Sequence, residues 1–212
     1  MKRIIVTGAA GRLGRLVVED LVGHGYDVLG VDCVRPASSS GRMLFADLTE
    51  AAAVYDVLRD ADGVIHLGAV PGPLSAPAST TFANNVMSTF HVAEAAAALG
   101  LKKLVFASSI FTLGWSEDAR RCWPKYVPVD EDHPSTPLEA YGLSKQVGED
   151  ICDQVSRRWG LPVVSLRIMN VIQPGGRADA DNDVDGFREG DFTGSRHERA
   201  IDGSVNHSAG TT

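Results

Sequence analysis

One stretch near the start decides the fold of this chain: Thr7-Gly8-Ala9-Ala10-Gly11-Arg12-Leu13-Gly14. It follows a short apolar run, Ile4 to Val6, which has the character of a buried strand. It precedes leucines and valines that recur at helical spacing as far as Leu21. A glycine-rich turn between a strand and a helix is the context that a dinucleotide-binding turn requires.

Each glycine of this turn has a physical task. Gly8 permits the tight turn, Gly11 lets the backbone approach a pyrophosphate, and Gly14 lets helix and strand pack closely. The phosphates are then expected at the positive end of the helix predicted over 12–23. The alternative for this triad, taken alone, is a strand-to-helix turn that binds no ligand.

A second pattern, Tyr141-Gly142-Leu143-Ser144-Lys145, lies far along the chain. Tyr141 and Lys145 stand one helical turn apart and therefore on the same helix face. There the ammonium group is expected to lower the pKa of the phenol enough for proton transfer near neutral pH. The alternative is a surface pair on an amphipathic helix.

The alternation of apolar runs and longer helical patterns predicts an α/β fold, a doubly wound parallel sheet of the Rossmann type with strand order 3-2-1-4-5-6. Strands are expected at about 3–7, 27–32, 42–46, 63–67, 103–107 and 162–168. Helices are expected at about 12–23, 50–59, 79–99 and 138–159, the third of them ending at Gly100.

Composition excludes several classes of partner. The chain has 212 residues and a formal charge of −7, which argues against nucleic acid or an anionic membrane surface as the main partner. No apolar run approaches the length of a bilayer span, and the start does not resemble a signal peptide, so a cytoplasmic protein is expected. Cys33, Cys122 and Cys152 lack metal-ligand spacing, so we expect reduced thiols and no metal site.

The last part of the chain, 177–212, changes character. It is polar and acidic, with few large apolar residues and no period among them, so we expect disorder. Residues 1–176 are then the folded domain. The run Asp181 to Gly186 matches half of a calcium loop, but Phe192 stands where a bidentate glutamate is needed, so no calcium site is expected.

The two motifs, with Ser108-Ser109 ending an apolar run between them, resemble the extended branch of the short-chain dehydrogenase/reductase superfamily, over 1–176. That branch contains NAD-dependent sugar epimerases, dehydratases and dehydrogenases. The runs Val105 to Ser109 and His66 to Gly68 are more similar to uronate-type sugar dehydrogenases than to strict nucleotide-sugar epimerases. The resemblance implies a substrate-binding subdomain that 177–212 largely lacks, so a C-terminally truncated member is expected.

The resemblance implies a catalytic set of Ser109, Tyr141 and Lys145, with Ser108 as the alternative serine. Tyr141 would exchange a proton with a substrate hydroxyl or carbonyl, and Ser109 would bind the reacting oxygen. Lys145 would bind the nicotinamide ribose and lower the pKa of the tyrosine. Asn170 would contact the substrate, and His66 is expected to be a packed histidine rather than a catalyst.

The implied cofactor is NAD, because Asp32 at the end of the second strand offers a carboxylate to the ribose hydroxyls and repels a 2′-phosphate. Arg12 and Arg35 are the nearby basic residues that would weaken this preference, and turn capping is the alternative for Asp32. Helix capping is the alternative for Asp47 and for Asn85. The implied cofactor-binding residues are Gly8, Gly11, Arg12, Leu13, Gly14, Asp32, Asp47, Leu48, Leu67, Gly68, Ala69, Asn85, Tyr141 and Lys145.

The expected function is that of an NAD-dependent oxidoreductase or epimerase/dehydratase acting on a sugar or nucleotide sugar. The alternative is a truncated or repurposed NAD-binding protein with little redox activity, used for cofactor sensing or non-redox chemistry. The resemblance also implies a homodimer that pairs the helices predicted at 79–99 and 138–159.

Overall fold

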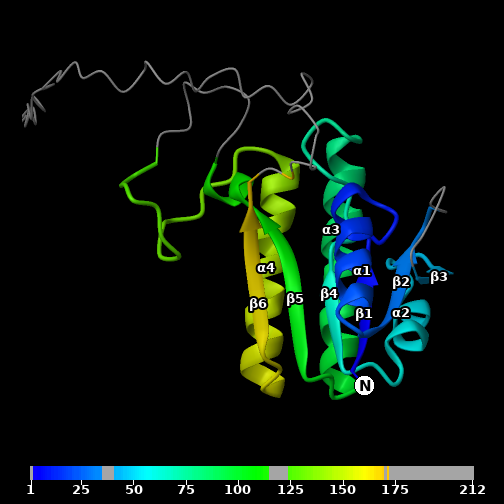
Figure 1. Ribbon diagram of the computed structural model, residues 1–212. Coiled ribbons are helices and arrows are strands. Elements are labelled where there is room, and N and C mark those ends of the chain that lie inside the picture. The colour runs from blue at the N-terminus through cyan, green and yellow to red at the C-terminus, as the bar shows by residue number, and fades with distance from the viewer. Residues whose placement is uncertain (1, 35–40, 115–123, 170, 172–212) are drawn as a thin grey trace, which may run out of the picture. The chain divides into compact units, whose positions relative to one another are not determined.

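Six parallel strands form one sheet in the order β3-β2-β1-β4-β5-β6 in the computed structural model, which describes residues 2–34, 41–114, 124–169 and 171 (Figure 1). This confirms the predicted parallel sheet and its strand order. The strands are β1 (Arg3–Thr7), β2 (Asp27–Asp32), β3 (Arg42–Phe45), β4 (Gly63–His66), β5 (Lys103–Ser109) and β6 (Val163–Ile168).

The strand order reverses direction between β1 and β4. Thr7, at the carboxyl end of β1, pairs with Val31 on one side and with His66 on the other. In doubly wound sheets ligands bind at the carboxyl edge beside this reversal, because the connections leave there in opposite directions and open a crevice. The fold thus fixes where a site is expected before any side chain is considered.

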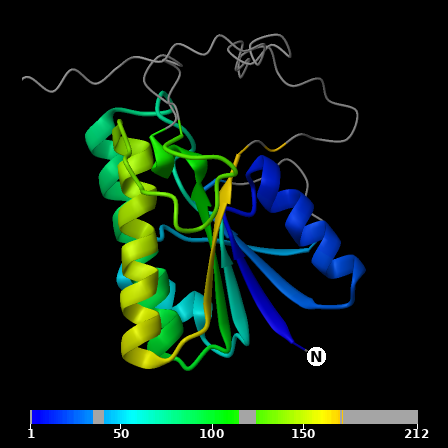
Figure 2. The ribbon, with the colours of Figure 1, turned by 90° about the vertical axis from the view of Figure 1, so that its left-hand side faces the viewer.

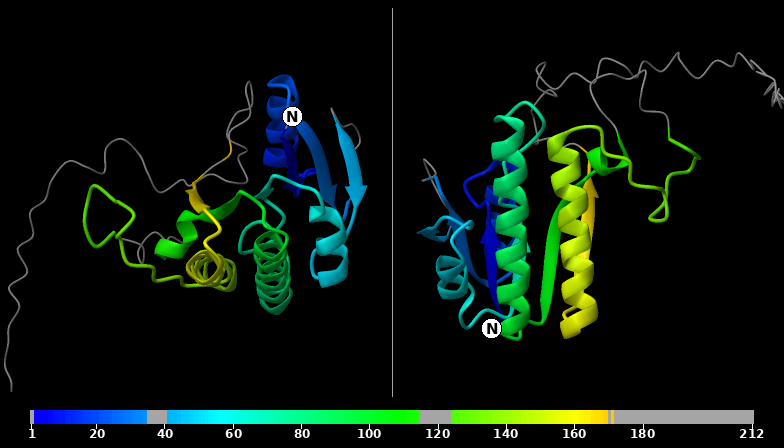
Figure 3. Two further views of the ribbon diagram at one scale, coloured as in Figure 1. Left: turned by 90° about the horizontal axis from the view of Figure 1, so that it is seen from below. Right: turned by 180° about the vertical axis from the view of Figure 1, so that it is seen from behind.

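Helices cover the two faces of the sheet unequally. Helix α1 (Arg12–Gly23) lies on one face, and α2 (Ala51–Leu58), α3 (Ala78–Ala98) and α4 (Ala140–Trp159) lie on the other (Figures 2 and 3). The larger core cluster lies on the three-helix face and includes Val54, Val92, Phe106, Cys152 and Val155. A smaller cluster under α1 contains Val6, Ala9, Val18 and Val28.

Most predicted boundaries hold to within two residues, and the differences fall near the expected site. Strand β5 continues to Ser109, whose side chain then caps a short 3-10 helix, η1 (Ile110–Leu113), that the sequence did not predict. Helix α4 begins at Ala140 because Glu139 caps it. Gly100 follows the end of α3 with a φ of +70°, as predicted for a helix terminus. Residues 177–212, with the calcium-like run, lie outside the described residues.

The packing of α4 on β5 yields a stability prediction. A Cβ on Gly148 would lie 2.5 Å from Cζ of the buried Phe106, whereas a Cβ on Gly23 would meet nothing within 4 Å. Gly148→Ala is therefore expected to lower the free energy of unfolding by about 1–3 kcal/mol, the usual cost of overpacking a core. Gly23→Ala, at the end of α1, is the matched control. Urea denaturation showing equal stability for the two variants would contradict this packing.

Candidate functional site

The glycine turn after β1 is closed on itself. Gly8 has a φ of +68°, and the Gly11 amide donates a 3.0 Å hydrogen bond to the Gly8 carbonyl. A Cβ on Gly14 would lie 2.1 Å from that same carbonyl oxygen, so α1 can start against the turn only where no side chain stands. Arg12 and Leu13 form the first turn of the helix.

The N-terminus of α1 fits an anionic group. Its N-cap is Gly11, and no side chain makes a capping hydrogen bond there among the described residues. The first backbone N–H groups of a helix have no partner within the helix, and they lie at the positive end of its dipole. This arrangement, with the backbone exposed by the glycines, suits the pyrophosphate of a dinucleotide.

The loop after β4 closes over the glycine turn. The amides of Leu67 and Gly68 donate hydrogen bonds of 3.2 and 3.1 Å to the hydroxyl oxygen of Thr7. A Cβ on Gly8 would lie 2.7 Å from the Gly68 nitrogen, and one on Gly68 would lie 2.9 Å from Leu48. The structure thus brings together predicted residues from three separate loops.

His66 is a buried link rather than an exposed base. The Thr7 hydroxyl oxygen already accepts two amides, so its own proton goes to His66 Nδ1, at 2.7 Å. His66 Nε2 then donates to the Thr89 hydroxyl at 3.2 Å, and Thr89 donates to the Asn85 carbonyl at 2.7 Å. Burial lowers the pKa of His66 to about 3, so the ring is neutral. His66 is therefore a packed histidine, as expected.

Asp32 ties the end of β2 to the glycine turn. One carboxylate oxygen accepts the Ala10 amide at 2.9 Å, and the other accepts the Val34 amide at 3.1 Å. The turn-capping role weighed for this residue is thus present in the structure. Each oxygen keeps a further lone pair, so the carboxylate also remains suited to a ribose diol.

Helix capping was the alternative role for Asp47 and for Asn85. Asp47 accepts hydrogen bonds from the amide and the hydroxyl of Thr49 at 2.9 and 2.8 Å, which lower its pKa. It therefore caps its own turn, and the N-cap of α2 is Glu50. A capping role for Asn85 is wrong, because α3 begins seven residues earlier, at Ala78.

Asn85 instead clamps the loop that contains Ala69. Its side-chain oxygen accepts the Val70 amide at 2.7 Å, and its nitrogen donates to the Val70 carbonyl at 3.2 Å. The same nitrogen donates to the Ser144 hydroxyl at 3.1 Å, and Ser144 donates to the Tyr141 carbonyl at 2.6 Å. A buried asparagine thus joins the β4 loop to the helix of the second motif.

Of the two candidate serines, Ser109 affects the pKa of Tyr141, whereas Ser108 hydrogen-bonds Glu149. A hydrogen bond from Ser109 lowers the pKa of Tyr141, but burial, with a further contribution from the Glu139 carboxylate, outweighs it and raises that pKa overall. The expectation that Lys145 lowers the pKa of Tyr141 is therefore wrong for this structure. Desolvation of the phenolate dominates, and the lysine is not among the causes.

Lys145 is buried beneath the phenol. Its Nζ atom donates a 2.8 Å hydrogen bond to the Ala107 carbonyl and lies 5.7 Å from the centre of the Tyr141 ring. Desolvation lowers the pKa of Lys145 to about 8. One of its three protons is thus committed to β5, and the group is poised to exchange charge close to neutral pH.

Sequence reasoning missed two carboxylates beside this set. Glu139 accepts the amides of Tyr141 and Gly142 at 2.6 and 2.7 Å and so caps α4. Glu149 binds Ser108 and Arg167. The available signal was spacing, since Glu149 follows Lys145 by one further helical turn. Asn170 and Arg35 lie outside the described residues.

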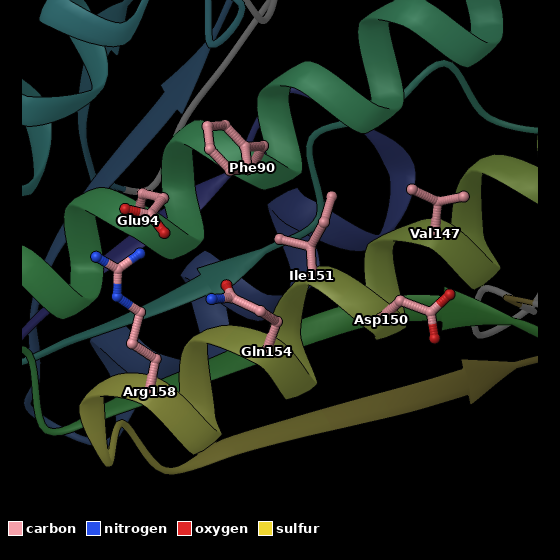
Figure 4. A pocket seen from close by; sticks show the side chains of 7 residues that line it. All are labelled: Phe90, Glu94, Val147, Asp150, Ile151, Gln154 and Arg158. Atoms are coloured by element: carbon pink, nitrogen blue, oxygen red, sulfur yellow. The ribbon is translucent and has the colours of Figure 1, made fainter.

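A groove between α3 and α4 lies apart from these residues (Figure 4). Phe90 and Glu94 line it from α3, and Val147, Asp150, Ile151, Gln154 and Arg158 line it from α4. Over the described ranges, no group of three or more His, Cys, Asp or Glu side chains is arranged to hold a metal. Nor does any helix in that part of the chain have both the length and the apolar character to span a bilayer.

Fold and site together define a Rossmann-type protein whose glycine turn and serine, tyrosine and lysine residues lie at the carboxyl edge of one sheet. Residues 4–188 match the NAD dependent epimerase/dehydratase family. The chain belongs to this family, as the sequence resemblance predicted, and NAD is the family's cofactor.

Relatives of this chain include both dehydrogenases and epimerases. It is 35% identical over 170 residues to a uronate dehydrogenase of Pseudomonas putida, covering 78% of this chain and 60% of the relative. It is 31% identical to a putative UDP-glucose 4-epimerase of Methanocaldococcus jannaschii, covering 79% and 55%.

Among solved structures, a short-chain dehydrogenase/reductase superfamily protein of Agrobacterium tumefaciens with bound NAD is 37% identical, with a TM-score of 0.69. The alignment covers 78% of this chain and 48% of that one. The chain thus spans 60% or less of the length of these relatives.

The position of Asp32 beside the turn yields a cofactor prediction. We expect NAD to bind more tightly than NADP, because a carboxylate repels a 2′-phosphate. Asp32→Asn should narrow that difference about tenfold, a change of one unit in the logarithm of the affinity ratio. Asp20→Asn, on the exposed side of α1, should leave it unchanged. Calorimetry that shows tighter NADP binding by the unmodified chain would refute the assignment.

Proposed function

We propose that residues 1–176 form an NAD-binding catalytic domain and that this domain oxidises or reduces a sugar at a carbon bearing a hydroxyl or carbonyl group. The observation that carries this proposal is the position of the buried Lys145 Nζ, which lies 5.7 Å from the centre of the Tyr141 ring and donates to the Ala107 carbonyl, two residues before Ser109 on β5. A phenol, a hydroxyl and an ammonium group held together at the carboxyl edge suit proton transfer to an oxygen.

The glycine turn and the uncapped start of α1 would hold the pyrophosphate, and Asp32 the adenosine ribose. Bound NAD supplies the hydride acceptor or donor in this chemistry. The residues of the chain supply the rest: they bind and orient the substrate oxygen and move its proton.

Tyr141 Oη is the atom at which the proton moves. Because the pKa of this phenol is raised, Tyr141 is protonated at neutral pH and is ready to donate to a substrate carbonyl. In the opposite direction the phenolate must accept a proton from a hydroxyl, so oxidation is expected to become faster as the pH rises. Ser109 orients the same substrate oxygen and stabilises the phenolate by its hydrogen bond.

Lys145 places an ammonium group close to the phenol, and no carboxylate of the described residues forms an ion pair with it. Its hydrogen bond to the Ala107 carbonyl fixes the ammonium group, and its remaining N–H donors suit a ribose hydroxyl. With its pKa lowered to about 8, Lys145 loses charge over the alkaline range in which the phenol is needed as a base. The two groups therefore set opposite limits on the pH range of the reaction.

The substrate class that we propose is a sugar acid or a related sugar, by similarity to the uronate dehydrogenases among the relatives. A nucleotide sugar is the alternative, because epimerases are also among them. The same NAD-binding domain serves both reactions, so the choice depends on the substrate side of the crevice.

The role of Tyr141 can be tested by removing one oxygen. Tyr141→Phe should leave the NAD affinity nearly unchanged and reduce turnover of uronate by about two to four orders of magnitude, the usual loss for a general acid/base. Initial rates of NADH formation measure turnover, and calorimetry measures the NAD affinity. Full turnover by the variant would remove Tyr141 from the mechanism. NAD binding without turnover in the unmodified chain would favour the alternative of a repurposed NAD-binding protein.

We also propose a homodimer through α3 and α4. Met87 and Phe90 are exposed on α3, and the groove beside them presents both acidic and basic side chains. A two-fold axis brings the same patch of both subunits together, so such a surface can complement itself.

The dimer yields a test with a matched control. We expect light scattering to report a dimer at micromolar concentration and Phe90→Lys to shift it toward monomer, because a charge would be buried without a partner. Val22→Lys, on the opposite face of the sheet, should remain dimeric. A monomer in the unmodified chain would contradict the proposal.

A further inference from the structure

The short 3-10 helix η1 lies between two parts of the proposed catalytic set. It begins directly after Ser109 at the end of β5, and its backbone approaches the first turn of α4, which contains Tyr141. The second residue of η1 is Phe111. Its amide contacts the serine, its ring contacts the tyrosine, and its carbonyl lies against α4.

The amide of Phe111 holds the Ser109 hydroxyl. This N–H donates a 3.3 Å hydrogen bond to Ser109 Oγ. A serine hydroxyl has a single proton, and an oxygen that accepts an amide keeps that proton for a different acceptor. Thr112 fastens the same turn, because its buried hydroxyl donates to the Ser109 carbonyl at 2.8 Å. The start of η1 thus restricts the direction in which Ser109 can donate.

The side chain of Phe111 packs on the Tyr141 ring. The two rings meet edge to face, with their centres 5.7 Å apart and their planes at 78°. This geometry is favoured for an aromatic pair, because the positive edge of one ring meets the negative face of the other. The Tyr141 ring is therefore supported by a residue of η1 as well as by Lys145 on its own helix.

The backbone of η1 lies too close to α4 for a side chain at Gly142. A Cβ on Gly142 would lie 2.5 Å from the Phe111 carbonyl oxygen. The segment that leads into α4 holds η1 as well. In this segment Thr136 donates from its amide to the Thr112 carbonyl at 2.9 Å and from its hydroxyl to the Leu113 carbonyl at 3.1 Å. These contacts leave η1 little freedom to move relative to α4.

We propose that Phe111 is a positioning residue whose ring holds the Tyr141 phenol in place and keeps water from it. Its amide contacts Ser109 at the same time, so one residue of η1 aligns the two groups that are expected to meet the substrate oxygen. The proposal rests on the proposed function only for what this alignment accomplishes. The effect of the ring on the phenol is tested without turnover.

Exclusion of water by the ring has a measurable sign. Burial is the largest cause of the raised pKa of Tyr141, and the Phe111 ring packs on this residue. A smaller side chain in place of Phe111 would let water reach the phenolate, so the pKa of Tyr141 would fall toward its ordinary value. Three polar groups also face the phenol and stay unchanged, namely Ser109 from β5, Glu139 from the start of α4 and Lys145 from α4.

The variants separate the ring from the backbone. Phe111→Leu keeps the amide and an apolar side chain but removes the ring. Phe111→Tyr keeps both the amide and the ring, and it is the conservative variant. Phe45→Leu removes an aromatic ring that is 63% exposed at the end of β3, and it is the control.

The readout is the ionisation of Tyr141 in the full chain labelled with fluorotyrosine, followed by fluorine NMR as the pH is raised. The Tyr141 signal is the one that disappears in Tyr141→Phe. We expect Phe111→Leu to lower the pKa of Tyr141 by about half a unit to one unit, the scale of one aromatic pair. Phe111→Tyr adds a signal of its own, and both it and Phe45→Leu should leave the pKa of Tyr141 unchanged.

The comparison of Phe111→Leu with Phe111→Tyr decides the question. A lowered pKa of Tyr141 in the first variant and an unchanged one in the second support the proposal. An unchanged or raised pKa in Phe111→Leu overturns it, and so does an equal fall in Phe111→Tyr or Phe45→Leu. Should Phe111→Leu fail to fold, Phe111→Met removes the ring with a longer, more adaptable side chain and is judged in the same way. Absence of turnover in the unmodified chain would contradict the proposed function and leave this result standing.

Discussion

The close approach of two backbones at the carboxyl edge of the sheet is the constraint on which the site depends. The turn after β1 and the loop after β4 lie so near each other that a Cβ on Gly8 would lie 2.7 Å from the backbone of Leu67 and Gly68. Thr7 fastens them by accepting the amides of Leu67 and Gly68. Because this contact lies where the strand order reverses, it shapes the crevice in which a cofactor is expected.

From this contact a buried chain of hydrogen bonds runs to the second motif. It passes from Thr7 through His66 and Thr89 to the Asn85 carbonyl, and the Asn85 side chain continues to Ser144. Ser144 donates to the carbonyl of Tyr141. Two short patterns that are more than a hundred residues apart in the sequence are thus joined by polar side chains that neither pattern contains in full. This linkage explains why Asn85 is buried in the middle of a helix.

The sequence alone predicted the fold well because its signals are local. Apolar runs, glycine turns and helical periodicity gave the strand order, most element boundaries and the family. The electrostatics of the site was harder to predict, because it depends on contacts distant in sequence. The pKa of Tyr141 was expected to fall with Lys145 nearby, but burial and Glu139 raise it. Likewise Glu149 on α4 forms an ion pair with Arg167 on β6, and spacing along one helix does not reveal a partner on a separate strand.

The buried chain through His66 also determines how the site responds to its surroundings. Each hydrogen bond in this chain has one donor and one acceptor. The His66 ring stays neutral until the pH falls to its pKa of about 3. Because the side chains of this hydrogen-bond chain are all neutral, we expect salt and mild acid to change it little. The hydrogen bonds that join the two motifs should therefore persist as the pH changes. The groups that change protonation are Tyr141 and Lys145. A site built in this way can change its protonation state without changing its shape.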